Sequence, residues 1–208
     1  MRIIAGQARG LTLKAPAGNA TRPMDGRTRG ALFNILFSRQ EGARILDLYA
    51  GSGSLGLEAL SRGAESCVFV ERSRAVGRVI AENLSRTGLE GGEILTMPSS
   101  LAIKTLQARG ERFSVAFFDP PFPLSRGAET RAGLLRELAE VASLLEPRGL
   151  VIWRLEKQNY HPGELPSCLH QTDRREYGRS LLVFLSPCGE ESAETSAEPE
   201  DADDGDSR

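Results

Sequence analysis

Short apolar runs alternate with helical patterns along most of this sequence. The predicted strands are the runs ILDLY, CVFVE, EILTM, FSVAFFD, GLVIWRL and SLLVFLS, and helical spacing of apolar residues lies between most of them. Parallel strands need a crossover connection, which is usually a helix. The alternation therefore predicts an α/β fold, with a doubly wound, mostly parallel sheet and helices on both faces.

The first 40 residues follow a different pattern. RIIAG and LTLKA are short alternating runs split by Arg9 and Gly10, which predicts a small hairpin or arm. Residues 28–38 place five apolar side chains on a broad helical face, with Thr28 as the N-cap. We expect an N-terminal arm and helix over residues 1–40 and one main domain over residues 41–187.

The charge is distributed unevenly along the chain. The last 20 residues hold nine acidic residues, one base and no aromatic residue, Leu, Ile or Val. Such a segment cannot repay the entropy of ordering, so we expect residues 188–208 to form a disordered acidic tail. The last 20 residues carry a net charge of −8, whereas the whole chain carries −2. Residues 1–188 therefore have a net charge of +6.

The basic excess lies at the N-terminus. Residues 1–40 hold seven bases and a single acid, Asp25. A polyanion-binding surface needs such an excess, because each phosphate contact releases counterions. A bias of the genome toward arginine is the alternative explanation, since 23 of the 26 bases are Arg. The predicted contacts with RNA or DNA are Arg2, Arg9, Lys14, Arg22, Arg27 and Arg29.

The sequence argues against several classes of protein. No apolar run approaches the roughly 18 to 20 residues that cross a bilayer, and the N-terminus lacks the apolar stretch of a secretory signal. Cys67, Cys168 and Cys188 are scattered without a CxxC pair, which suggests neither a disulfide framework nor a zinc site. We expect a reduced, cytoplasmic protein with no metal and no membrane contact, and a monomer because no oligomerisation element is recognisable.

A glycine-rich turn follows the first predicted strand of the main domain. Residues 45–60, ILDLYAGSGSLGLEAL, contain Gly51, Gly53 and Gly56 in GxGxxG spacing before a helical pattern. Backbone without Cβ atoms lets a ligand approach the helix N-terminus closely. Glu71 ends the next strand 20 residues after Gly51, where its carboxylate could bind ribose hydroxyls. Both a nicotinamide dinucleotide and S-adenosylmethionine fit this pattern.

Asp47 discriminates between these two cofactors. It lies in the strand just before the turn, where a carboxylate would repel the pyrophosphate of a dinucleotide. S-Adenosylmethionine has no phosphate and carries a sulfonium and an ammonium, which Asp47 and Glu71 would attract. We therefore favour S-adenosylmethionine over NAD.

The residues Asp119, Pro120, Pro121 and Phe122 end another predicted strand. Successive prolines cannot extend a sheet, so they predict a stiff turn at its carboxyl edge, where open α/β sheets bind ligands. Asp119 and the Pro120 carbonyl could accept hydrogen bonds from an exocyclic base amine, and Phe122 could stack on a flipped base. The turn indicates methyl transfer to such an amine. The alternative is a strand end in which Asp119 caps a helix and Phe122 packs in the core.

Together these segments resemble a known family, the class I S-adenosylmethionine-dependent amino-methyltransferases, and specifically the bacterial 16S ribosomal RNA guanine-N2 methyltransferases of the RsmD type. The resemblance covers residues 1 to about 186 and rests on MRIIAGQARGLTLKAP, TRPMDGRTRGALFNIL, ILDLYAGSGSLGLEALSRGA, FVE and FFDPPF. It implies a Rossmann-like fold, S-adenosylmethionine as methyl donor and an RNA-binding N-terminal arm. It also implies one guanine of the small-subunit RNA as substrate, presented in a ribosomal assembly particle.

The resemblance implies a role for each matching position. Gly26 and Gly30 depart from the family, which usually has an acid there, and this would loosen the N-terminal segment. Serines stand where related enzymes often have an acid near the adenine, although a hydroxyl can still bind the adenine amine. Catalysis would belong to Asp119, Pro120, Pro121 and Phe122, and cofactor binding to Asp47, Tyr49, Gly51, Ser52, Gly53, Gly56, Glu71, Ser99 and Ser100.

These motifs define the reaction better than the substrate. Guanine, adenine and cytosine all present exocyclic amines, so a DNA or RNA adenine-N6 or cytosine-N4 methyltransferase is the main alternative. Only the N-terminal resemblance selects 16S rRNA. An NAD-dependent oxidoreductase and a noncatalytic RNA-binding protein fit the residues less well.

Overall fold

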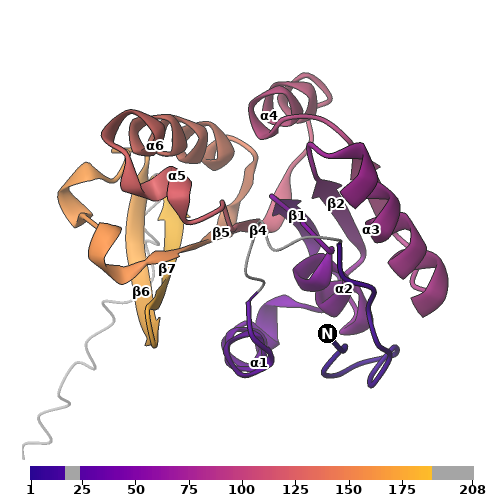
Figure 1. The fold of residues 1–208 in the computed structure, drawn as a ribbon. Coiled ribbons are helices and arrows are strands. Elements are labelled where there is room, and N and C mark those ends of the chain that lie inside the picture. Colours follow the sequence, from indigo (N-terminus) through magenta and orange to yellow (C-terminus); the bar gives the residue numbers. More distant parts are fainter. Residues whose placement is uncertain (17–23, 189–208) are drawn as a thin grey trace, which may run out of the picture.

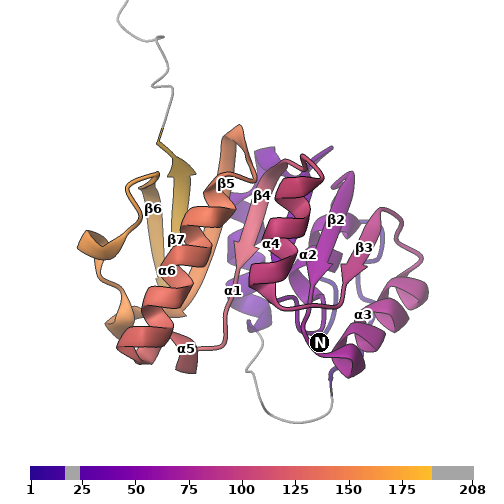
Figure 2. The same cartoon turned by 90° about the horizontal axis from the view of Figure 1, so that it is seen from above.

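One sheet of seven strands organises the molecule. The computed structural model describes residues 1–16 and 24–188 and has the strand order β3-β2-β1-β4-β5-β7-β6 (Figure 1; β3 is labelled in Figure 2). The strands are β1 (Arg44–Leu48), β2 (Ser66–Val70), β3 (Gly92–Leu95), β4 (Phe113–Phe118), β5 (Leu145–Glu156), β6 (Leu169–Tyr177) and β7 (Ser180–Pro187). Strands β1 to β5 pair in parallel, and β7 pairs antiparallel with β5 and β6. The mostly parallel sheet predicted from the alternating pattern is confirmed.

Helices cover both faces of the sheet. The helices are α1 (Gly26–Ile35), α2 (Ser54–Ser61), α3 (Arg74–Thr87), α4 (Ser99–Ala108), α5 (Pro123–Arg126) and α6 (Ala128–Ala142), with short 3₁₀ turns η1 (Phe37–Arg39), η2 (Lys157–Asn159) and η3 (Pro162–Glu164). Helices α1, α2 and α3 pack on one face, while α4 and α6 pack on the other (Figure 1, Figure 2). The doubly wound arrangement is therefore confirmed.

Each central strand contributes to two hydrophobic cores. In β1, Ile45 belongs to the buried cluster that contains Phe33 of α1 on one face, while Leu46 belongs to the cluster that contains Ile103 of α4 on the other. Successive side chains of a strand point to opposite faces, so an almost wholly apolar strand buries both.

The N-terminal hairpin is present and rests on α2. The Ile3 amide donates to the Leu11 carbonyl at 3.0 Å, and an isolated antiparallel bridge joins Arg2 to Thr12. Glu58 of α2 accepts the Ile4 amide at 2.8 Å and the Ala5 amide at 3.1 Å. A buried carboxylate thus ties the hairpin to the helix that follows the glycine turn.

The predicted N-cap of the first helix is wrong. Asp25, not Thr28, caps α1, because its carboxylate accepts the Thr28 amide at 2.9 Å. The predicted span 28–38 is also shifted, since α1 ends at Ile35 and Phe37–Arg39 form a separate 3₁₀ turn. Phe37 leaves the predicted apolar face and is 80% exposed.

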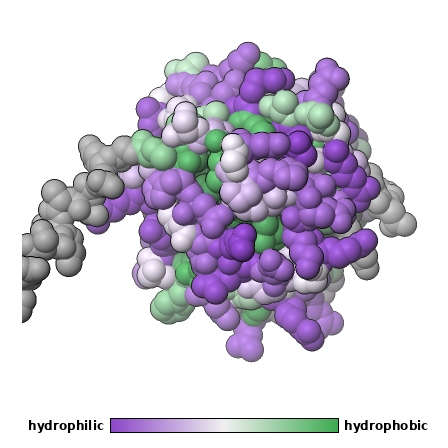
Figure 3. Space-filling view, turned by 90° about the vertical axis from the view of Figure 1, so that its left-hand side faces the viewer, coloured by the Kyte–Doolittle hydropathy of each residue, from purple (hydrophilic) through white to green (hydrophobic). Residues whose placement is uncertain are grey.

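Strand β6 has no counterpart among the predicted strands. It is an edge strand in which only Leu169 is fully buried, so it lacks the apolar run that revealed the central strands. Figure 3 views the molecule from the side of β6 and shows a mostly hydrophilic face with small, scattered apolar areas. Within the described residues, no helix is both long and apolar enough to cross a membrane.

Candidate active site

The carboxyl ends of β2, β1 and β4 bring three carboxylates to one edge of the sheet. In the parallel register, Leu48 of β1 pairs with Val70 of β2 and with Phe118 of β4. Glu71 and Asp119 each follow one of these partner residues, and Asp47 lies in β1 itself. Adjacent parallel strands that end at the same level place their next residues together, so the two sequence motifs meet in space.

The glycine turn between β1 and α2 contains both open and packed glycines. Gly51 (φ 54°) has nothing within 4 Å of the position that a Cβ atom would take, so the turn is open there. Gly56 differs, because a Cβ atom would lie 2.3 Å from the Phe69 ring and 2.4 Å from the Cys67 sulfur. Gly51 leaves room for a ligand, whereas Gly56 allows α2 to pack tightly against β2. Gly56 therefore has a packing role, and its contact with the cofactor stays a prediction.

Asp47 is the most buried of the three carboxylates. Its side chain accepts the Gly56 amide at 3.0 Å, and the residue is 1% exposed. Burial raises the pKa of Asp47 to about 7, against the lowering effect of the Gly56 bond, and the charges of Asp119 and Glu71 raise it further. This carboxylate therefore changes its charge close to neutral pH.

Glu71 fixes the turn from the neighbouring strand. Its carboxylate accepts the Gly51 amide at 3.2 Å and the Ser73 amide at 2.8 Å, one on each oxygen. Each oxygen of a carboxylate can accept a second bond, so Glu71 can still bind a hydroxyl pair. The open space at Gly51 and the anionic lining from Asp47 and Glu71 fit a cationic nucleoside cofactor such as S-adenosylmethionine.

Tyr49 and Ser99 meet a third residue that the sequence did not indicate. Tyr49 donates to the carboxylate of Glu137 on α6, and the Ser99 hydroxyl lies 2.9 Å from the same carboxylate. Burial, with the Glu137 bond as a second cause, raises the pKa of the Tyr49 phenol. Glu137 thus places an acid beside Ser99, while Ser100 is exposed.

The Asp-Pro-Pro-Phe turn is also organised by an unpredicted residue. Arg154 of β5 donates from Nε to Asp119 at 2.6 Å, and its guanidinium carbon lies 4.9 Å from the centre of the Phe122 ring. Burial raises the pKa of Asp119, and the Arg154 charge and hydrogen bond lower it. A carbonyl oxygen has two lone pairs, so the Pro120 carbonyl can accept a hydrogen bond from a substrate.

The remaining predicted residues divide between the surface and the interior. Ser52 is buried, and its carbonyl accepts a bond from Asn83, while Gly53 forms the N-cap of α2 in the left-handed conformation. Of the predicted RNA contacts, Arg22 lies outside the described residues, and the exposed ones are Arg2, Arg9, Lys14 and Arg27.

The predicted RNA contact of Arg29 is wrong. Its side chain is 1% exposed, donates to the Arg2 carbonyl and lies 3.7 Å from Glu58. A guanidinium enclosed between α1, the hairpin and α2 cannot reach a phosphate. Arg29 holds the N-terminal hairpin in place instead.

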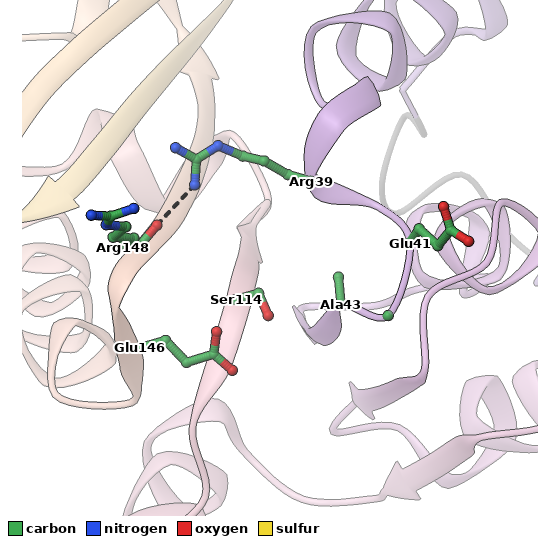
Figure 4. Close-up of a pocket in the computed structure, with 7 residues that line it drawn as sticks. Arg39, Glu41, Ala43, Ser114, Glu146 and Arg148 are labelled. Carbon is green, nitrogen blue, oxygen red and sulfur yellow. Dashed lines mark hydrogen bonds between the residues drawn. The ribbon is translucent and has the colours of Figure 1, made fainter.

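A pocket of about 220 Å³ lies at the opposite end of the sheet. Ala43, Ser114 and Glu146 line it near the amino ends of β1, β4 and β5, and Arg39 donates to the Arg148 carbonyl at 2.8 Å (Figure 4). None of the three carboxylates lies in its lining. We therefore do not assign the cofactor to this pocket. Within the described residues, no group of three His, Cys, Asp or Glu side chains could hold a metal ion.

The strand order, the glycine turn after β1 and the acidic strand ends define a class I methyltransferase, a class that uses S-adenosylmethionine as methyl donor. The chain belongs to the family described as Conserved hypothetical protein 95, the RsmD family, which matches residues 1–186.

Individual relatives agree with this membership. The Ribosomal RNA small subunit methyltransferase D of Escherichia coli strain K12 is 40% identical over 149 residues, which cover 72% of this chain and 68% of the relative. The protein of the same name from Haemophilus influenzae is 36% identical over 159 residues, covering 76% and 79%. The solved structure of a hypothetical protein from Thermus thermophilus is similar with a TM-score of 0.74 and 38% identity, covering 89% of this chain and 99% of that one.

Proposed function

We propose that this protein methylates the exocyclic N2 amine of a guanine in 16S rRNA of the small ribosomal subunit. The observation that carries the proposal is the meeting of the Asp119 to Phe122 turn with the glycine turn at one sheet edge. The relatives named small subunit methyltransferase D support the RNA substrate. We assign the exposed bases of residues 1–40 to RNA binding and residues 41–187 to the cofactor and catalysis.

Asp119 prepares the amine for reaction. The lone pair of the amine is delocalised into the guanine ring, so the amine is a poor nucleophile. The Asp119 carboxylate and the Pro120 carbonyl accept hydrogen bonds from the two N–H groups of the amine. These hydrogen bonds localise the lone pair on the nitrogen and fix its direction. Phe122 stacks on the flipped base and keeps it in plane with these acceptors.

The charge at the site favours the same reaction. Bound S-adenosylmethionine supplies an electrophilic methyl group on a sulfonium. The amine nitrogen gains that group as the carbon–sulfur bond breaks, becomes positively charged, and then releases one proton to solvent. Asp119 lies next to this nitrogen and stabilises the charge while it develops.

The proposal also covers the particle that carries the RNA, the oligomeric state of the enzyme and the compartment of the reaction. We propose that the RNA is presented in a small-subunit assembly particle, that the enzyme acts as a monomer, and that the reaction takes place in the cytoplasm, where ribosomes are assembled. The position of Asp47 in β1, just before the glycine turn, supports S-adenosylmethionine over a dinucleotide, because a pyrophosphate beside the ionised carboxylate would be repelled.

Methyl transfer to small ribosomal subunits that lack the modification tests this function. We expect label from S-adenosylmethionine to appear as N2-methylguanosine after nucleoside digestion. Asp119→Asn should lower kcat by about 10²- to 10⁴-fold with cofactor affinity retained, whereas the control Asp173→Asn on β6 should keep full activity. Label in methyladenine or methylcytosine of duplex DNA would instead support the amino-methyltransferase alternative, and full activity of Asp119→Asn would remove this residue from catalysis.

A further inference from the structure

Arg154 contacts both side chains to which the proposed function gives chemistry. In the register of β4 and β5, Phe118 pairs with Trp153, so Asp119 and Arg154 are the next residues on neighbouring parallel strands. The Nε atom of Arg154 lies 2.6 Å from Asp119 Oδ1, and its guanidinium carbon lies 4.9 Å from the Phe122 ring centre. A single cation therefore touches the amine acceptor and the stacking ring.

Both partners of this ion pair are shielded from solvent. The Arg154 side chain is 10% exposed and the Asp119 side chain 15% exposed. Arginine is suited to such a place because its planar group can hydrogen-bond in its plane and stack on an aromatic face at the same time. A lysine ammonium could keep the charge but could not do both.

We propose that Arg154 is a positioning residue for methyl transfer. It holds one oxygen of Asp119 so that the other is left to accept the amine, and it covers one face of Phe122 so that the base stacks on the other. This proposal rests on the proposed function. Arg154 itself touches neither the base nor the cofactor in the proposed arrangement.

The charges around Asp119 determine how its ionisation responds to Arg154. Burial raises the pKa of Asp119, and Arg154 opposes this effect. Among the described residues, the charged groups at this edge include the acids Asp47 on β1, Glu71 after β2 and Glu156 on β5, and the bases Arg72 after β2 and Arg179 before β7. Glu156 forms an ion pair with Arg126 at 2.8 Å. Loss of the Arg154 charge must therefore move the pKa of Asp119 upward, and only ionised Asp119 accepts the amine with both oxygens free of protons.

The test is the pH dependence of methyl transfer to guanine by Arg154→Gln and Arg154→Lys. We expect Arg154→Gln to lower kcat by about 100-fold and to move the acid limb of the profile up by about one pH unit or more. Arg154→Lys should lower kcat but leave the acid limb close to that of the wild type, because it keeps the charge and loses the planar contacts. Cofactor affinity measured by calorimetry should change little in both.

Arg62 offers a matched control. It forms an ion pair with Glu58 at 2.7 Å and lies 5.1 Å from the Phe33 ring centre, with its side chain 11% exposed. Like Arg154, it therefore has an ion pair and a contact with an aromatic ring, but neither involves a proposed catalytic group. Arg62→Gln should lower the melting temperature and leave the acid limb where it is.

The outcomes separate this proposal from the proposed function. An unmoved acid limb in folded Arg154→Gln overturns the positioning role, even if kcat falls. If Arg154→Gln does not fold, Arg154→Lys decides, and wild-type kcat in that variant overturns the role. Methylation of another base by the wild-type protein would overturn only the guanine assignment. The role of Arg154 would then be tested by the pH profiles of the same variants with that other base as substrate.

Discussion

The three carboxylates at the carboxyl edge of the sheet differ in burial, in hydrogen bonding and in the charges around them. Asp47 is buried and accepts one amide bond, so burial raises its pKa to about 7. Glu71 accepts two backbone amides and fixes the turn. Asp119 is paired with Arg154, which opposes the effect of burial on its pKa. Residue type alone therefore does not set the role of any of them.

Cofactor affinity should depend on the ionisation of Asp47. Because its pKa is raised to about 7, Asp47 is mostly protonated at lower pH, and only the ionised form attracts the cationic cofactor. We expect the affinity for S-adenosylmethionine to fall by up to about tenfold per pH unit below 7 and to level off above it. Calorimetric titrations of the wild type and of Asp47→Asn with S-adenosylmethionine between pH 5.5 and 8 measure this pH dependence. Any ionisation of the cofactor itself affects both proteins equally, so the difference between them reports on Asp47. If the affinity of Asp47→Asn fell with pH in the same way as that of the wild type, Asp47 would not be the group that controls cofactor binding.

At the scale of elements, side chains of α2 and α3 fasten the N-terminal hairpin close to the glycine turn. Asn83 of α3 is fully buried, accepts the Lys14 amide at 2.8 Å and donates to the Lys14 carbonyl at 3.0 Å. The same side-chain amide donates to the Ser52 carbonyl at 3.1 Å. One side chain thus joins the proposed RNA-binding segment to the glycine turn, which we propose faces the cofactor.

Asn83→Leu should loosen this connection. The variant removes three hydrogen bonds and leaves their buried backbone partners unsatisfied, which should lower the free energy of unfolding by about 2 to 4 kcal/mol. Denaturant unfolding measures the loss, and hydrogen exchange should become faster around Lys14 and Ser52. The exposed Asn34 on α1 is the control, since Asn34→Leu should change stability by less than about 0.5 kcal/mol. Equal stability of the two variants would show that Asn83 does not fasten the hairpin.

At the scale of the whole molecule, the basic excess marks the side on which we propose that RNA binds. The exposed bases Arg2, Arg9 and Lys14 lie on the hairpin, and Arg27 lies at the start of α1. The interior position of Arg29 removes one predicted contact. Phosphate contacts by the exposed bases would make binding strongly dependent on salt.

Replacing Arg2, Arg9 and Arg27 together by Gln should weaken RNA binding and its salt dependence. We expect the slope of log K against log salt to become shallower by about 2 to 3, because each lost contact removes one released counterion. Arg112, Arg136 and Arg148 are exposed outside the hairpin and α1, so their triple Gln variant is the control. Filter binding to the 16S RNA at several salt concentrations measures both slopes. Equal slopes in the two variants would place the RNA elsewhere.

The sequence by itself determined the architecture and the outline of the site. Helix and strand periods arise from local backbone geometry, so apolar spacing was enough to predict the parallel sheet and its covering helices. The glycine turn and the Asp-Pro-Pro-Phe turn each follow a strand directly, and parallel strands bring their carboxyl ends to one edge. The sequence therefore predicts Asp47 and Glu71 as cofactor-binding residues and Asp119 as a catalytic residue, and the structure brings all three to one sheet edge. Strand β6 escaped prediction because an exposed edge strand has no apolar run.

Only the tertiary structure decided which side chains pair and which are buried. Arg154 lies 35 residues from Asp119 in sequence, and Glu137 lies 88 residues from Tyr49. Arg29 and Arg27 are two residues apart, yet one is enclosed and the other exposed. Local sequence gives no measure of such long-range proximity, because burial, hydrogen bonding and pKa depend on groups that distant parts of the chain bring together.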